Sequence, residues 1–172
     1  MQDAGAPAWV APHCRCVACL AAAMADAAER NGLELDRDLV VAGALLHDVG
    51  RAVTQDVRHA GLGADLLRSE GWPEPVVLVV ERHTGGGLDA TEAQALGLPV
   101  KDYTPVTLEE RIVCHADNLY SGEKRLTLAQ VQAKYEAKGL RAAWLKIRRL
   151  HEALTTELGV DLEGLRPAEL EL

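Results

Sequence analysis

Six side chains that can bind metal ions are spread along the 172-residue chain. They are His13, His47, Asp48, His59, His83 and Asp117. Imidazole and carboxylate together suit Mn, Fe, Zn or Mg and can leave coordination positions open. Adjacent residues on a helix point about 100° apart, so His47 and Asp48 cannot both face one small ion squarely. A pair of ions bridged by Asp48 would use both directions.

Helix start and stop signals indicate which elements position these residues. An Ala-rich helix over about 12–30 ends at Asn31-Gly32, and a helix capped by Asp36 leads to His47-Asp48 and ends at Gly50. Further helices are predicted over about 57–70, 73–82, 89–97, 107–120, 127–139 and 140–158. Most of the candidate ligands then lie at helix ends, where side chains can converge on one cleft.

Local patterns support this helical division. Asp89 with Glu92, and Thr107 with Glu110, match the capping-box pattern of helix starts. The run 76–80, all Val or Leu, has strand propensity, but a lone strand would lack a partner, so we predict a helix there. Aromatic residues make up 3% of the chain and Phe is absent, which favours closely packed helices with small aliphatic side chains.

Charge and composition narrow the classes of partner. A net charge of −8 argues against a general binder of nucleic acid or of a membrane surface. No apolar run approaches the ~20 residues that span a bilayer, and residues 1–13 lack the features of a signal peptide. Three of the four cysteines crowd residues 14–19, a poor disulfide framework. We therefore expect a cytoplasmic protein with no membrane and no polymeric nucleic acid as partner.

Three segments resemble the signature of the HD-domain superfamily of metal-dependent phosphohydrolases. The segment 41–51 contains His47-Asp48, His13 with Val17 resembles the first histidine motif, and 115–119 resembles the closing aspartate motif. The resemblance covers about residues 12–125. It implies an all-α, single-domain bundle of HD type over 1–172, with the motif core at 12–125 and C-terminal helices at 127–158 packed on it.

Two further histidines resemble the extra ligands of binuclear members of this superfamily. The resemblance implies that His13, His47, Asp48 and Asp117 hold one metal with Asp48 bridging, and that His59 and His83 complete the second. It implies two divalent ions, Fe or Mn, with Ni, Zn or Mg as further options. Such a pair activates water for in-line attack on phosphorus.

The resemblance predicts a phosphohydrolase acting on a nucleotide or another small phosphate ester, with Asp48 and Arg51 as catalytic residues. Arg51 replaces the Lys of the usual HD-x-x-K ending and still offers a planar cation for phosphate. Arg82, Lys124 and Arg125 are weaker candidates for substrate binding. Two alternatives stay open: a di-iron oxygenase of HD type, and a non-catalytic metal-binding signalling module.

Several other residues fit a structural role better. His13, Cys14, Cys16 and Cys19 suggest zinc, but structural zinc sites draw ligands from two separated knuckles, and no second CxxC exists. His115 lies about 200° around a helix from Asp117, and is left out of the site. His151 falls on the apolar stripe of the last helix. This stripe, around Trp144, is a possible homodimer face.

Overall fold

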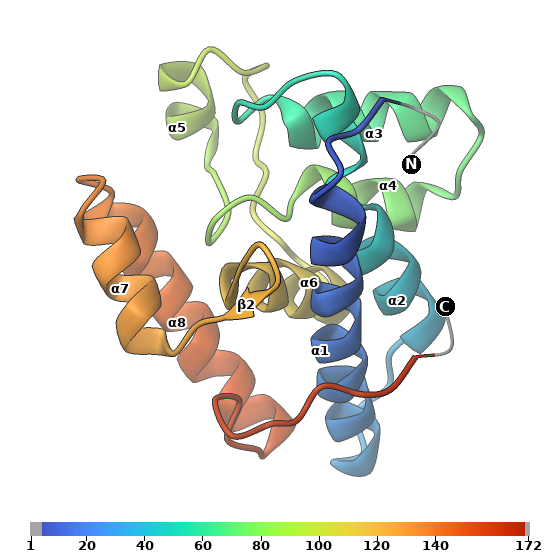
Figure 1. Cartoon of the computed structure of the whole chain (residues 1–172), viewed down its shortest axis with the longest axis vertical. Coiled ribbons are helices and arrows are strands. Elements are labelled where there is room, and N and C mark those ends of the chain that lie inside the picture. The colour runs from blue at the N-terminus through green and yellow to red at the C-terminus, as the bar shows by residue number, and fades with distance from the viewer. Residues whose placement is uncertain (1–4, 171–172) are drawn as a thin grey trace.

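Helix α1 is the central element of the structure, a computed structural model that describes residues 5–170 (Figure 1). The elements are α1 (Val10–Arg30), α2 (Arg37–Leu46), η2 (Val49–Ala52), α3 (His59–Ser69), α4 (Glu74–Glu81), α5 (Ala90–Ala95), α6 (Leu108–Asn118), β1 (Tyr120–Ser121), β2 (Lys124–Arg125), α7 (Leu128–Glu136) and α8 (Arg141–Leu158). Helix α1 packs against α2, α6 and α8. The Ala-rich sequence explains this, since small side chains let three helices approach one axis.

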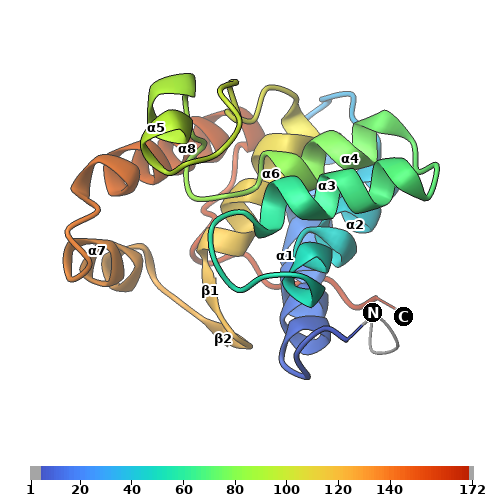
Figure 2. The ribbon, with the colours of Figure 1, turned by 90° about the horizontal axis from the view of Figure 1, so that it is seen from above.

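The core has two parts. The larger apolar cluster joins α1, α2, α6 and α8 and includes the fully buried Leu20, Met24 and Ile147. The smaller cluster lies around α3 and α4 and includes Leu67 and Val80. Figure 2 shows α7 and α8 on one side of α6, with α3 and α4 on the other. The all-α, single-domain architecture expected from the sequence is therefore confirmed.

A close backbone approach fixes the turn after α2 against α3. At Gly50 in η2, an added Cβ would lie 2.0 Å from the carbonyl oxygen of His59 and 2.7 Å from the amide nitrogen of Gly63. Such distances are far below van der Waals contact, so only glycine fits at position 50. This contact holds the start of α3 beside the segment that carries His47 and Asp48.

Helix caps follow the sequence closely. Asp36 accepts a hydrogen bond of 2.9 Å from the Leu39 amide, and Asp89 with Glu92 forms a complete capping box. At Thr107 the box is incomplete, because the Glu110 carboxylate accepts hydrogen bonds from Arg82 and from the Val106 amide. Residues 76–80 are helical as predicted, within α4.

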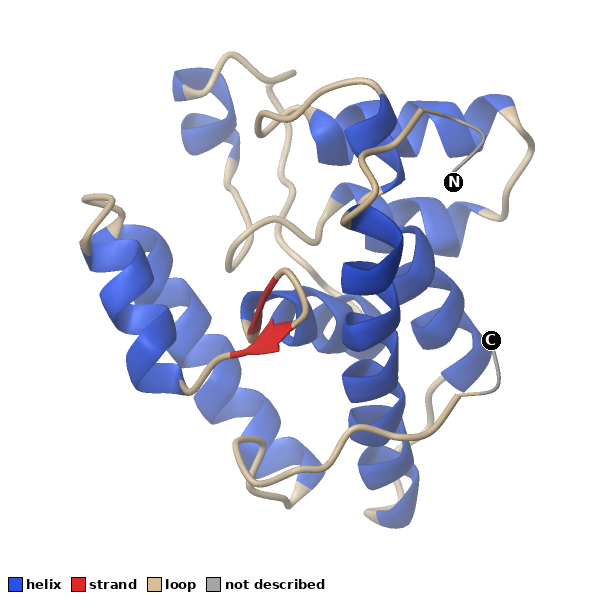
Figure 3. Cartoon of the chain, in the orientation of Figure 1, coloured by secondary structure: helices blue, strands red, loops and turns tan. Residues whose placement is uncertain are grey.

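The hairpin β1–β2 was not predicted, and it is the one sheet in the described residues (Figure 3). Helix α6 ends at Asn118 instead of reaching Tyr120, and Tyr120 pairs with Arg125 in the hairpin. Gly122 adopts a φ of 60° at its turn, a conformation that glycine enters freely. The hairpin brings the Gly122 carbonyl to α1.

The apolar stripe of α8 does not provide a dimer face. Trp144 is 5% exposed, and Ile147 and Leu154 are fully buried in the core that α8 shares with α1 and α6. The stripe is already covered within the chain and is not free to form the possible homodimer, whose existence stays a prediction. Among the described residues, no helix has the length and apolar character needed to cross a bilayer.

Candidate metal centre

The six candidate ligands converge from five helices. His13 lies in the first turns of α1, His47 caps the C-terminus of α2 and Asp48 follows it. The other three lie at the start of α3, just after α4 and in the last turn of α6; they are His59, His83 and Asp117. The four histidines and Asp48 are at most 5% exposed, whereas the Asp117 side chain is 24% exposed and faces a cavity.

One group of ligand atoms surrounds Asp117. Its Oδ1 lies 3.0 Å from His13 Nε2 and 3.6 Å from His47 Nε2, and the two Nε2 atoms are 3.3 Å apart. Asp48 Oδ2 lies 3.9 Å from His47 Nε2 and 4.0 Å from His13 Nε2. The chemistry of this group suits a divalent cation with mixed nitrogen and oxygen ligands.

A second group surrounds the other oxygen of Asp48. Its Oδ1 lies 3.1 Å from His59 Nε2 and 3.8 Å from His83 Nε2, and these two nitrogens are 3.0 Å apart. Asp48 therefore offers one carboxylate oxygen to each group. In this arrangement the Asp48 carboxylate would suit a bridging position between two ions.

The orientation of each imidazole is fixed by the backbone. Nδ1 lies 2.8 Å from the Gly122 carbonyl in His13, 2.7 Å from Ala44 in His47, 2.8 Å from Asp56 in His59 and 2.6 Å from Val80 in His83. A carbonyl only accepts, so we infer that each Nδ1 carries the hydrogen. Each Nε2 then offers its lone pair to a cation, or holds a proton that a cation would displace.

The electrostatics favour the metal-binding protonation state at Asp48 and His83 but not at His47. Burial lowers the pKa of His47, but its interactions with Cys14 and Asp117 outweigh burial and raise this pKa well above its usual range, so a cation would have to displace the proton. Burial would raise the pKa of Asp48, but the hydrogen bond with His59 and the charge of His47 outweigh it and hold this pKa well below its usual range. Burial, together with the charges of His47 and His59, lowers the pKa of His83 to about 3. At neutral pH Asp48 is therefore ionised and the His83 ring is neutral, as metal ligation requires.

All of the candidate ligands except His47 line a cavity of about 290 Å³. Arg51 lines it, and its Nε donates to Asp48 Oδ1 over 3.0 Å while the guanidinium carbon lies 6.0 Å from the centre of the Trp9 ring. Lys134 and Lys138 line the α7 side. Burial, partly offset by the charge of Asp117, lowers the pKa of Lys134.

Sequence reasoning missed the two lysines of this wall. Their four-residue separation predicts one helix face. Nothing local indicated, however, that this face would turn to the cavity, since the packing of α7 on α8 decides its orientation. Tyr135, which also lines the cavity, was missed for the same reason.

Three predicted substrate-binding residues lie elsewhere. Arg82 donates to both carboxylate oxygens of Glu110, over 3.1 and 3.0 Å, and so neutralises a buried charge. Arg125 donates to the carbonyls of Leu162 and Leu165 and anchors the C-terminal segment. Lys124 is exposed on β2. None of these three lines the cavity of the metal centre.

The residues left out of the centre also have structural partners. His115 Nε2 lies 3.0 Å from His151 Nδ1, away from the six ligands. Cys114 donates to the Gly85 carbonyl over 3.0 Å. In the described part of the chain, no cysteine belongs to either cluster of potential metal ligands.

Comparison with known proteins shows which family has this arrangement. The model of the HD domain matches residues 10–122. The chain belongs to the HD domain family. The solved HD domain of the L. monocytogenes phosphodiesterase PgpH, in complex with cyclic-di-AMP, matches 98% of this chain and 96% of its own chain, with a TM-score of 0.53 and 20% identity. That likeness supports the fold.

Two similar relatives have a name from RNA modification. A protein of Picrophilus torridus named tRNA (cytidine(56)-2'-O)-methyltransferase is 52% identical over 130 residues, which are 76% of this chain and 38% of that protein. A protein of the same name from Thermoplasma volcanium is 46% identical over 161 residues, 94% of this chain and 46% of its own. The chain therefore spans less than half the length of these relatives.

These names correct two predictions. The predicted function, a phosphohydrolase acting on a nucleotide or another small phosphate ester, is wrong, because the relatives at 46–52% identity are named for a methyl transfer to tRNA. The exclusion of polymeric nucleic acid is wrong for the same reason. The physical error was to judge partners from the net charge of −8, which sums over the whole chain. Local charge decides recognition, and Arg51, Lys134 and Lys138 gather at one cavity.

Proposed function

We propose that this HD domain holds two divalent metal ions and hydrolyses a phosphate ester bond of an RNA, with tRNA as the substrate class. The observation that carries the proposal is the set of four Nδ1–carbonyl hydrogen bonds, which turn four Nε2 atoms toward the carboxylates of Asp48 and Asp117. We assign one ion to His13, His47, Asp48 and Asp117. The second goes to His59 and His83, with Asp48 bridging.

The donor set suits redox-active and hydrolytic metals alike, and we favour Fe or Mn. Divalent ions at such a site supply Lewis acidity and an activated water to the hydrolysis of a phosphate ester. The protein's own cations then act on the substrate. Arg51 reaches the edge of the centre, and Lys134 with Lys138 provides positive charge across the cavity, where phosphate oxygens would bind.

The relatives favour RNA as the polymer that enters the cavity. We assign phosphate ester chemistry to this chain, rather than the methyl transfer in the relatives' name, because the buried histidines and carboxylates at its cavity form clusters that could hold metal ions. Less than half of each relative is matched, which leaves room for a second activity outside the matched region. The cytoplasmic location expected from the sequence agrees with this role and stays a prediction.

The test uses tRNA transcripts labelled at the 5' or 3' end, the metal-loaded full chain, and separate Mn, Fe and Zn preparations. We expect release of phosphate or of RNA fragments, lost in Asp48→Asn and retained in His151→Asn, a variant outside the centre. A methyl-donor assay runs in parallel. Methyl incorporation without cleavage or phosphate release in any metal form would contradict the proposal.

A further inference from the structure

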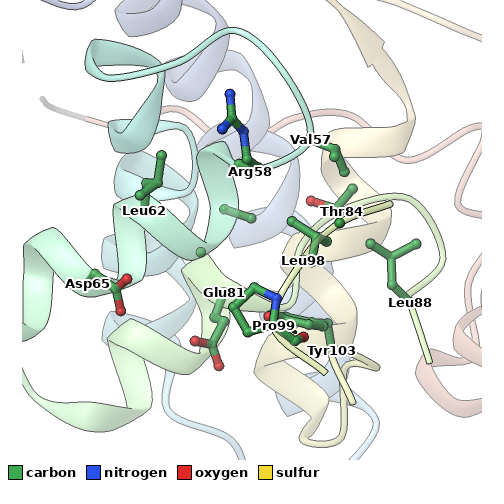
Figure 4. Close-up of a pocket in the computed structure, with 13 residues that line it drawn as sticks. Val57, Arg58, Leu62, Asp65, Glu81, Thr84, Leu88, Leu98, Pro99 and Tyr103 are labelled. Atoms are coloured by element: carbon green, nitrogen blue, oxygen red, sulfur yellow. Dashed lines mark hydrogen bonds between the residues drawn. The ribbon is translucent and has the colours of Figure 1, made fainter. Parts of the chain in front are cut away.

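A second cavity lies directly beside the metal centre. It measures about 150 Å³ and is bounded by α3, the end of α4 and the segment 97–103 (Figure 4). Its walls are mainly apolar and include Leu62, Leu88, Leu98, Pro99 and Tyr103. An apolar cavity of about 150 Å³ engineered into another protein binds one benzene molecule. The volume of this cavity therefore matches one six-membered ring.

Charged side chains also line this apolar cavity. Glu81 is buried, whereas the side chains of Asp65 and of the cation Arg58 are 74% and 59% exposed. Asp65 and Glu81 lie across it from Thr84 and Leu88 (Figure 4). Glu81 is only 4% exposed, and its two ion-pair partners both bind Oε1: Arg68 at 3.1 Å and Lys101 at 2.6 Å. Neither bond uses Oε2, so the carboxylate keeps accepting capacity for an amino group.

Thr84 connects the two cavities. It follows the candidate ligand His83 and lines both spaces. Its Oγ1 is buried and makes no hydrogen bond to the described residues. A buried hydroxyl without a partner is costly, which indicates that a bound group completes it. The two cavities therefore share a wall at Thr84, which places the smaller cavity next to the candidate metal centre.

We propose that the smaller cavity is a subsite for an unpaired cytosine of the RNA, adjacent to the phosphate at the metal centre. This inference rests on the proposed function. Unpaired bases are recognised by stacking on side chains and by bonds to their edges. The single ring of a pyrimidine matches the volume. Cytosine N4 donates to carboxylates, whereas uracil presents the O4 acceptor, which a carboxylate repels.

The test compares labelled single-stranded oligo(C), oligo(U) and oligo(A) RNA by fluorescence anisotropy on the metal-loaded full chain. We expect oligo(C) to bind at least about tenfold more tightly than the others, the scale of one good base contact. Gly61 lines the cavity on α3, and an added Cβ meets no atom within 4 Å, so Gly61→Leu fills the space. Ala153→Leu, at an exposed position of α8, is the matched control.

Gly61→Leu is expected to bind oligo(C) no better than oligo(U), with unchanged metal content, while Ala153→Leu keeps the preference. Glu81→Gln, checked for folding by thermal denaturation, is expected to narrow the difference between C and U. Equal binding of C and U by the unmodified chain, a preference for oligo(A), or a preference that survives in Gly61→Leu would overturn the subsite. A preference for C without hydrolysis of tRNA would sustain the subsite and count against the proposed function alone.

Discussion

Tyr135 donates a hydrogen bond of 2.9 Å to Oδ1 of Asn118, and this bond ties α7 to the residue next to Asp117. Asn118 in turn donates to the carbonyls of Cys114 and Gly85. One amide therefore joins α6, α7 and the loop that follows His83. The bond sets the distance between the lysine-bearing helix and the metal centre.

Tyr135→Phe is expected to lower the free energy of unfolding by about 1 kcal/mol, the usual net value of one hydrogen bond. The two metal ions should stay bound, since no ligand changes. The KM for tRNA should rise more than kcat falls, because α7 carries Lys134 and the turn directly after it carries Lys138. Denaturant unfolding, metal analysis and kinetics measure the three quantities. A loss of metal would show that the tyrosine acts on the ligands themselves.

Metal stoichiometry tests the assignment of ligands. We expect two ions per chain in protein purified without added metal, and one in His59→Ala or His83→Ala, because each variant removes a nitrogen from the group at Asp48 Oδ1. Elemental analysis provides the count. His151→Ala, whose ring contacts His115, is the control and should keep two. A single ion per unmodified chain would show that the assignment of His59 and His83 as ligands of a second ion is wrong.

The roles of Lys134 and Lys138, which line the cavity, are tested by removing their charges. Lys134→Ala and Lys138→Ala should each raise the KM for tRNA about tenfold, since a hydrogen bond to a charged group contributes ~1.5–3 kcal/mol. The ratio of each variant's KM to the KM of the unmodified chain should fall at high salt, because salt weakens the phosphate contacts of the unmodified chain as well. Lys124→Ala, on the exposed strand β2, should change KM little. A larger rise in KM for Lys124→Ala than for the other two variants would support the substrate-binding role of Lys124 predicted from the sequence.

Gly50 provides a test of the packing that positions His59. Gly50→Ala places a methyl group 2.0 Å from the His59 carbonyl oxygen, so α3 must move. We expect a loss of about 1–3 kcal/mol in the free energy of unfolding and a lower occupancy of the second ion. Gly61→Ala, where the methyl group meets open space, should be about 0.5–1 kcal/mol more stable than the unmodified chain. Equal stability of the two variants would contradict this account.

An ion pair between α6 and α8 predicts a dependence on pH. Arg111 donates to both oxygens of Glu157, over 2.7 and 3.0 Å, and this bonding lowers the pKa of Glu157 despite the opposing effect of burial. The stabilisation is present above the unfolded value, about 4.3, and is lost as pH falls through the lower native pKa.

Glu157→Gln should therefore lower stability by about 0.2–1 kcal/mol at pH 7 and have a smaller effect at pH 3. Urea unfolding at both pH values measures the difference. Glu70→Gln, at an exposed position, is the matched control and should have little effect at either pH. An effect of Glu157→Gln that is as large at pH 3 as at pH 7 would mean that the ion pair does not carry the stability.

The sequence predicted those parts of the fold that depend on short-range interactions. Asp36, Asp89 and Thr107 mark helix starts because a cap acts within three residues. The candidate ligands could be found because most lie beside such helix ends. The hairpin at Tyr120 escaped prediction because each strand has two residues, too few for an alternating pattern.

Partners distant in the sequence could not be predicted. Arg82 resembled a phosphate ligand until the fold placed Glu110 beside it, 28 residues later. Lys134 gave no signal of its own, because the packing of α7 on α8 sets the direction of its side chain. Local sequence therefore indicates which groups carry charge, whereas tertiary contacts decide which of those charges stay available for a substrate.

The carbonyl of Gly122 fixes the ring of His13 across 109 residues of chain. During synthesis on a ribosome, His13 emerges early, and the atom that orients it emerges only after β1 has been made. Asp117, its other partner, is 104 residues away and emerges equally late. The nascent chain therefore cannot complete this centre until residue 122 has left the exit tunnel. A metal ion held by all of these side chains would therefore bind only after that point of synthesis.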